Sequence, residues 1–182
     1  SITALSFVTF ASPLPGSPYA TLGSFPVPVV IDRSGRFMYV GQGVGSFDGS
    51  IAVFAIDATT GVLSHIPGSP FPEPPSFGRI AALALSPDGR FLFSGSSALA
   101  TYTLNPATGV PTRINSRNGY YYGLAVDPTG KFIFGVDDND DLLHGFSIAA
   151  DGKLTPAGVP QQVGTLTRVT TAIISVADLV YV

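Results

Sequence analysis

The 182-residue chain lacks cysteine and tryptophan and is poor in charge. Without cysteine it forms no disulfides and performs no thiol chemistry, and this absence says nothing about the compartment. Charged residues make up only 12% of the chain, against about 25% in an average soluble domain. The net charge is −3 and no basic stripe is present, which argues against a nucleic-acid partner. No apolar run reaches the roughly 18 residues that cross a membrane, so no membrane span is expected.

The first residues, Ser1 to Ala4, lack the basic segment that opens a secretory signal peptide. Any such signal would therefore lie outside this chain. Lysine and glutamate are scarce while serine, threonine and glycine are frequent, a composition that favours a secreted or cell-surface protein.

Turn-forming residues are abundant. The chain holds 21 glycines and 16 prolines, spread along its length, and 45% of its residues are hydrophobic. This distribution predicts many short strands joined by tight turns around a sizeable core.

One phrase of sequence recurs. It occupies residues 34–40, 88–94 and 129–135, and a degenerate copy occupies residues 177–182. The intervals from Phe37 to Phe91 to Phe132 to Leu179 are 54, 41 and 47 residues. Self-similarity at this period indicates a repeat architecture, in which each unit buries its apolar face against its neighbours.

Each repeat reads as four short strands. An apolar strand ends in a turn such as Asp127-Pro128-Thr129-Gly130, and the recurring phrase forms the second strand. The third strand alternates with period two and places Phe54, Tyr102 and Phe146 in one register. We expect the fourth strand to be short and polar, as an outer edge is.

These observations predict an all-β fold, a β-propeller built of four-stranded antiparallel blades. A β-sandwich or an open β-solenoid is the alternative. The predicted units are an outer half blade at 1–25, whole blades at 26–72, 73–115 and 116–162, and an inner half blade at 163–182.

Several motifs resemble the YVTN/lactonase-type β-propeller family, which includes 6-phosphogluconolactonase-like propellers. They are Asp127 to Phe134, Asn105 to Gly109 and Ile66 to Phe71, with the name motif partly kept at Tyr39 to Gln42 and Tyr181-Val182. The resemblance implies a propeller, and lactonase activity as one of its functions. Because similar proteins have about twice this length and seven blades, we expect a partial chain. The alternative joins the two half blades into a composite blade of a smaller ring.

Three arginines precede predicted innermost strands and are the candidate ligand-binding residues: Arg79, Arg117 and Arg168. At a channel mouth a guanidinium binds carboxylate or phosphate in a bidentate way. Their alternative role is that of solvated loop charges.

The acidic run 137–141 is the candidate metal site, with Asp137, Asp138 and Asp140 as possible Ca²⁺ ligands. Its spacing does not match an EF-hand, so we expect a solvated hairpin, no cofactor and no response to chelators. Neither His65 nor His144 is spaced from an acidic residue as metal ligands are, and both are expected to be structural.

No catalytic constellation is evident, so the sequence favours a binding or assembly scaffold whose partner is a protein, a carbohydrate or further copies of itself. The alternative is a lactonase-like hydrolase of sugar-acid lactones, which would be cytoplasmic. A second alternative is a self-assembling structural subunit.

Two structural expectations follow from the repeat. Phe37, Phe91, Phe132, Phe54, Tyr102 and Phe146 are expected to be buried between blades. Residues 1–10 are expected not to pair with residues 176–182, which leaves the ring open.

Overall fold

The computed structural model describes residues 13–44, 48–74, 77–162, 174–176 and 179–181. Within these residues the fold is all-β and contains no α-helix, as predicted. None of the described segments forms a helix of the length and apolarity that crossing a membrane requires.

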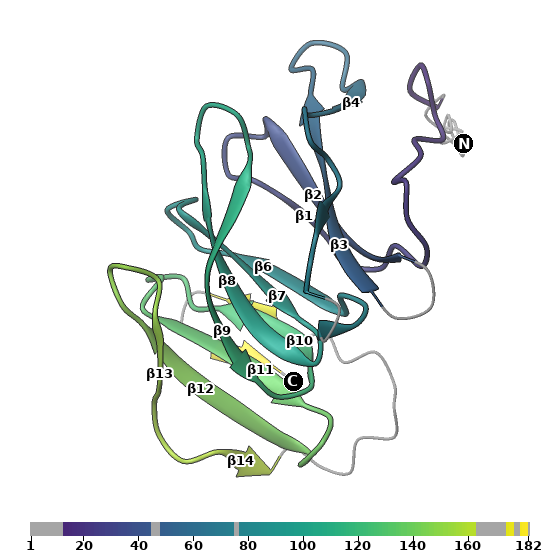
Figure 1. The fold of residues 1–182 in the computed structure, drawn as a ribbon. Helices are drawn as coiled ribbons and strands as arrows, with labels where there is room; N and C mark the ends of the chain where they lie inside the picture. The colour runs from purple at the N-terminus through teal and green to yellow at the C-terminus, as the bar shows by residue number, and fades with distance from the viewer. Residues whose placement is uncertain (1–12, 45–47, 75–76, 163–173, 177–178, 182) are drawn as a thin grey trace, which may run out of the picture.

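Three antiparallel sheets make up most of the molecule (Figure 1). The first contains β1 (Val29–Ile31), β2 (Phe37–Val44), β3 (Asp48–Ile56), β4 (Leu63–His65) and β5 (Phe71–Pro72). The second contains β6 (Ala82–Leu85), β7 (Phe91–Gly95), β8 (Ala98–Leu104) and β9 (Pro111–Asn118). The third contains β10 (Tyr121–Val126), β11 (Phe132–Asp137), β12 (Leu142–Ile148), β13 (Leu154–Pro156) and β14 (Gln161–Gln162). A hairpin of β15 (Ile174–Val176) and β16 (Leu179–Tyr181) follows.

The sheets are arranged as blades. In each, the strands pair with their neighbours in chain order, and the innermost strands lie beside one another, β1 against β6 and β6 against β10. The next innermost strand, β15, contacts β10. Figure 1 shows the three sheets following one another around the molecule. The predicted β-propeller of four-stranded blades is therefore confirmed.

The outermost strand differs between blades. In the first and third sheets it is split into two short pieces, β4 and β5 on β3, and β13 and β14 on β12. In the second sheet it is one strand of eight residues, β9, with a bulge between Thr101 and Tyr102 of its partner. The expectation of a short fourth strand is therefore wrong for this sheet. The segment that splits the strand in the first sheet, Pro67 to Pro70, has no counterpart there.

The turn from the first to the second strand is built the same way in each sheet. The glycines Gly35, Gly89 and Gly130 have φ of 71°, 74° and 71°, a conformation that favours glycine. The first residue of the turn then accepts the backbone N–H of the aromatic residue that opens the next strand: Asp32 from Phe37, Ser86 from Phe91 and Asp127 from Phe132. These hydrogen bonds hold the recurring phrase in register.

The core lies between neighbouring sheets. One apolar cluster joins the first and second sheets around Ile80, and another joins the second and third around Phe93. Of the six aromatic residues expected to be buried, five are at most 8% exposed: Phe37, Phe54, Phe91, Tyr102 and Phe146.

Phe132 is 40% exposed, so the expectation is wrong for this ring. In the earlier repeats a glycine of the following sheet covers the equivalent ring. A Cβ on Gly109 would lie 2.5 Å from Phe37, and one on Gly152 would lie 2.7 Å from Phe91. For Phe132 the covering turn would belong to a following outer half blade, and the described residues do not supply one.

The segment before the first sheet repeats the local structure of the split outer strand. Gly16 and Gly68 have φ of 87° and 85°, and each lies under an aromatic ring, Tyr19 or Phe71. The expectation that residues 1–10 do not pair with residues 176–182 falls largely outside the described residues. The division into 1–25, 26–72, 73–115, 116–162 and 163–182 stays a proposal.

Candidate functional site

The connections between second and third strands mark one end of the sheets, which we call the hairpin face. It includes Ser96-Ser97 and the acidic hairpin 138–141. Two candidate arginines lie at this end: Arg79 packs against Gly43 at the end of β2, and Arg117 pairs in register with Leu99 near the start of β8.

The structure does not bring these two arginines together. The exposed Arg79 stands over the Phe25 ring at 5.6 Å, whereas Arg117 stands over Phe146 of the third sheet at 5.1 Å. Arg117 also lies within strand β9 and not in the loop that leads to the next innermost strand, which corrects its expected position. Arg168 lies outside the described residues.

Beside Arg117, the acidic hairpin contributes a compact polar cluster. Nε2 of His144 lies 2.9 Å from Oδ2 of Asp140, and the ligating atoms of Asp137, Asp140 and His144 all lie within 4.8 Å of one another. Asp138 is not part of this group; its backbone N–H donates to the carbonyl of Tyr120. The structure therefore joins two of the three predicted acidic residues with a histidine that the sequence did not link to them.

Aromatic rings fix the position of that histidine. The His144 imidazole stacks on Phe146 with an interplanar angle of 10°, and the edge of Tyr121 meets it at 88°. Burial, with the negative charges of Asp137 and Asp140, raises the pKa of Tyr121 to about 12, and the positive charge of Arg117 acts in the opposite direction. Tyr121 is therefore a neutral hydroxyl at neutral pH.

Gly119 allows this close packing. It has φ of 144°, and a Cβ there would lie 2.5 Å from the Tyr121 ring and 2.8 Å from Oδ2 of Asp137. Glycine is the residue that admits both neighbours without strain. The signal in the sequence was the Asn118-Gly119 step before a buried strand, which sequence reasoning passed over.

His65 has the structural role expected of it. Its ring nitrogens lie 3.0 Å from Oγ of Ser69 and 2.8 Å from the carbonyl of Ala20, and it packs on Phe54 at 4.2 Å. These contacts tie the preceding segment to the first sheet. No acidic residue forms a hydrogen bond with it among the described residues.

A second buried polar group lies between the first two sheets. Glu73 is 4% exposed, and its Oε1 accepts a hydrogen bond of 2.7 Å from Ser94. Its burial would not be expected from sequence, because the residue sits in a proline-rich crossing segment. Ser94 and Glu73 thus form a buried hydroxyl–carboxylate pair, and no arginine or histidine among the described residues forms a hydrogen bond with either.

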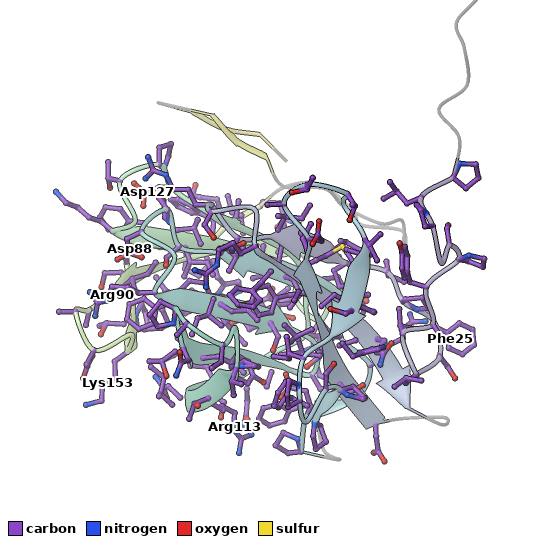
Figure 2. All side chains as sticks on the ribbon, turned by 90° about the horizontal axis from the view of Figure 1, so that it is seen from above. Phe25, Asp88, Arg90, Arg113, Asp127 and Lys153 are labelled. Atoms are coloured by element: carbon purple, nitrogen blue, oxygen red, sulfur yellow. The ribbon has the colours of Figure 1, made fainter. Side chains whose placement is uncertain are left out.

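At the opposite end of the sheets, described residues line a shallow depression. It has a volume of about 300 Å³ and is lined by residues of the turns between first and second strands: Ile31, Arg33, Leu85, Ser86 and Pro87. Figure 2 shows Asp88, Arg90 and Asp127 of this turn end at one side of the molecule and Phe25 at the other. The lining of this depression does not include the Asp140–His144 pair.

Comparison with known proteins agrees with this architecture. The sequence profile of the family described as "Lactonase, 7-bladed beta-propeller" matches residues 69–171, more than half of the chain. The chain belongs to this lactonase family. A comparison with curated protein sequences finds no significant match.

Solved structures in the lactonase family's fold superpose on most of the chain. A periplasmic gluconolactonase from Pseudomonas aeruginosa has a TM-score of 0.66 and 26% identity, over 79% of this chain and 41% of its own. A protein from Bacteroides uniformis, provisionally assigned as a 6-phosphogluconolactonase, has a TM-score of 0.69 and 19% identity, over 78% and 42%. A similarly assigned protein from Bacteroides fragilis gives 0.68 and 20%, over 79% and 40%. The chain thus spans about two fifths of the length of these neighbours.

Proposed function

We propose that this chain supplies part of the reacting face of a lactonase that hydrolyses a sugar-acid lactone. One observation carries the proposal: the hairpin face holds an Asp140–His144 pair and the guanidinium of Arg117, and both the imidazole and the guanidinium stand over Phe146. Because the chain spans about two fifths of its solved neighbours, the activity of the whole protein is part of the proposal.

The histidine would act as the general base. An ionised carboxylate only accepts hydrogen bonds, so the Nε2–H of His144 donates to Asp140 and the neutral imidazole leaves Nδ1 without a proton. Nδ1 takes a proton from water while the water oxygen bonds to the lactone carbonyl carbon. As the ring C–O bond breaks, that proton passes to the departing alkoxide oxygen, and the product is the open hydroxy acid.

Arg117 would stabilise the negative charge that develops on the carbonyl oxygen. It is half-buried on β9, and its stack on Phe146 fixes the plane of its N–H donors. A positioned donor of this kind contributes most where the charge appears only in the transition state.

The charge of the face favours a neutral substrate. Four carboxylates, Asp137, Asp138, Asp140 and Asp141, lie in the acidic run 137–141, and Arg117 is an arginine whose charge acts on neighbouring Tyr121. A phosphate group placed here would be repelled, so we expect gluconolactone to be hydrolysed faster than its 6-phosphate.

Family membership supports this hydrolase, the alternative raised from the sequence, over a binding scaffold, which was the first expectation. The expected secreted or cell-surface location and the protein, carbohydrate or self partners stay predictions. One solved neighbour is periplasmic, and that is a property of the neighbour.

Hydrolysis of gluconolactone above its spontaneous rate, followed by base uptake at constant pH, tests the proposal. Arg117→Gln and His144→Gln should each reduce the catalysed rate by about 100-fold. The matched controls are Arg113→Gln and His65→Gln. Arg113 lies on β9, as Arg117 does, but its guanidinium stands over the ring of Phe77 at 5.3 Å, and His65 contacts Ser69 in the first sheet. Activity lost equally in variant and control, or no rate above the spontaneous one, would exclude the proposed roles.

A further inference from the structure

The acidic hairpin and the adjacent strand place three ligating side chains around one point. The ligating atoms of Asp137, Asp140 and His144 lie within 4.8 Å of one another. The His144–Asp140 separation of 2.9 Å compares with about 3.0 Å between adjacent octahedral ligands and about 3.4 Å between tetrahedral ligands on an ion with bonds of about 2.1 Å. A small closing movement of Asp137 would complete a three-ligand set.

Both carboxylates are oriented by the backbone. Oδ1 of Asp137 accepts the N–H groups of Tyr120 and Asn139, at 3.1 and 2.9 Å, and Oδ1 of Asp140 accepts that of Leu142 at 3.0 Å. Each aspartate thus uses one oxygen for anchoring and presents the other, Oδ2, to the cluster. Such outer hydrogen bonds position metal ligands in characterised sites.

One of the two aspartates is held largely out of water. Asp137 is only 7% exposed, and no hydrogen bond reaches its Oδ2 from the part of the chain that the structure describes. The oxygen lies over the Cα of Gly119, where a side chain would block it. A carboxylate held largely out of water is favoured by a compensating positive charge nearby.

The local charge balance points the same way. Asp137 and the acidic hairpin carry four carboxylates, and within the described residues none of them forms a salt bridge with a lysine or arginine. Among the described residues, Arg117 is the cation whose charge acts on neighbouring Tyr121. A divalent cation would neutralise the excess negative charge.

We propose that Asp137, Asp140 and His144 bind one divalent transition-metal ion, of the Zn²⁺ or Mn²⁺ class. Ca²⁺ takes oxygen ligands, whereas an imidazole with two carboxylates suits these borderline ions. Nε2 of His144 becomes a ligand, and its ring proton moves to Nδ1. Water fills the remaining positions. The sequence-based expectation of no response to chelators considered Ca²⁺ and aspartate ligands alone. It therefore does not apply to a site that includes His144.

The inference goes beyond the proposed hydrolase. With a metal bound, the imidazole is a ligand and no longer accepts a proton from water, and the water on the ion has a lowered pKa. Hydrolysis that is undiminished in EDTA would leave the proposed function standing without a metal. Metal binding without hydrolysis would leave this inference standing without the function.

Calorimetric titration of the EDTA-treated full chain with ZnCl₂ and with MnCl₂ tests the site. We expect one ion per chain, and at least about tenfold weaker binding in Asp140→Asn and His144→Gln, which each remove a ligand. Asp138→Asn is the matched control, because it makes the same charge change in the same hairpin outside the cluster. It should bind within about twofold of the parent.

Equal affinities of Asp138→Asn and Asp140→Asn would overturn the proposal and indicate general attraction to an acidic hairpin. Absence of binding by a parent chain whose circular dichroism shows folded β-structure would overturn it as well. Co²⁺ substitution supplies a second readout, since an N- and O-ligated ion gives visible absorption that the His144→Gln variant should lose.

Discussion

Single glycines decide how closely neighbouring sheets approach. The Cα of Gly109, in a turn of the second sheet, lies directly against the ring of Phe37 in the first. Gly152 stands in the same relation to Phe91 of the second sheet. The arginine that precedes each phenylalanine donates a hydrogen bond to the same turn. Arg36 donates to the carbonyl of Pro106, and Arg90 donates to that of Ala150. Between the first and second sheets, and again between the second and third, one turn glycine and one arginine thus contribute to the contact between blades.

A Gly109→Ala variant should be less stable than Gly89→Ala. Both glycines have φ of 74°, so alanine suffers the same backbone strain in each. Only at position 109 would the Cβ overlap a ring, whereas nothing lies within 4 Å at position 89. We expect a difference of ~1–3 kcal/mol in the free energy of unfolding, measured by urea denaturation. Equal losses would show that the contact with Phe37 is not limiting.

Replacing the repeated phenylalanines by alanine should have unequal effects. Phe91 is 3% exposed and Phe91→Ala should cost ~3–5 kcal/mol of stability. Phe132 is 40% exposed, so Phe132→Ala should cost only ~1–2 kcal/mol, because much of its ring already contacts water. Denaturant midpoints of the two variants check this order, and a reversed order would contradict the described packing.

At the scale of elements, the turn from first to second strand is a pH-sensitive unit. Burial by itself raises the pKa of Asp32, but hydrogen bonds from the Ser34 hydroxyl and the backbone N–H groups of Phe37, Arg36 and Ser34 outweigh it and lower the pKa below 3.8. Burial also raises the pKa of Asp127, but hydrogen bonds from Thr129 and from the backbone N–H of Phe132 outweigh it and lower that pKa. Both carboxylates therefore stabilise the fold in their ionised form.

Asp32→Asn should weaken the loss of stability in acid. Because the folded pKa is lower than the unfolded value of 3.8, the carboxylate's contribution is complete above that value and disappears as the pH falls through the folded pKa. The parent should lose stability more steeply than the variant between about pH 5 and pH 2. Asp48→Asn, away from such a turn, is the control. Parallel profiles for all three proteins would contradict the role of the turn.

At the scale of the whole molecule, the blades share their cores. Ile80 is fully buried, leads into the second sheet, and packs with Tyr39 and Ile51 of the first and Leu92 of the second. Among the described residues, the first sheet also has a smaller apolar cluster of its own, formed by Val40, Ala52 and Phe54. We therefore expect the first two sheets to unfold together.

An Ile80→Ala variant should lower hydrogen-exchange protection in β2 and β7 alike. The substitution should cost ~2–5 kcal/mol and should do so in both sheets, because the cavity opens between them. Ile114→Ala on β9 is the control, since Ile114 is 42% exposed and should change protection little. Protection lost in β7 alone would show that the sheets unfold independently.

The sequence by itself determined the all-β class, the repeat and the turns. These depend on local chemistry: a glycine at positive φ, an Asp or Ser that caps the next strand, and alternation along a strand, all readable within a few residues. The same locality explains the family resemblance, because its motifs are the turns that recur in every blade. It also explains the error at Phe132. Periodicity shows that this ring faces the next blade, but it does not show whether a turn of that blade packs on the ring.

The tertiary structure alone decided the candidate site. Asp137 ends β11 and Asp140 lies in the turn that follows, and the pairing of β11 with β12 brings both aspartates close to His144 of β12. Arg117 reaches the same cluster from another sheet, through the ring of Phe146. Contacts between blades depend on how sheets stack and on the glycines that let them approach, and no spacing within a single repeat encodes them.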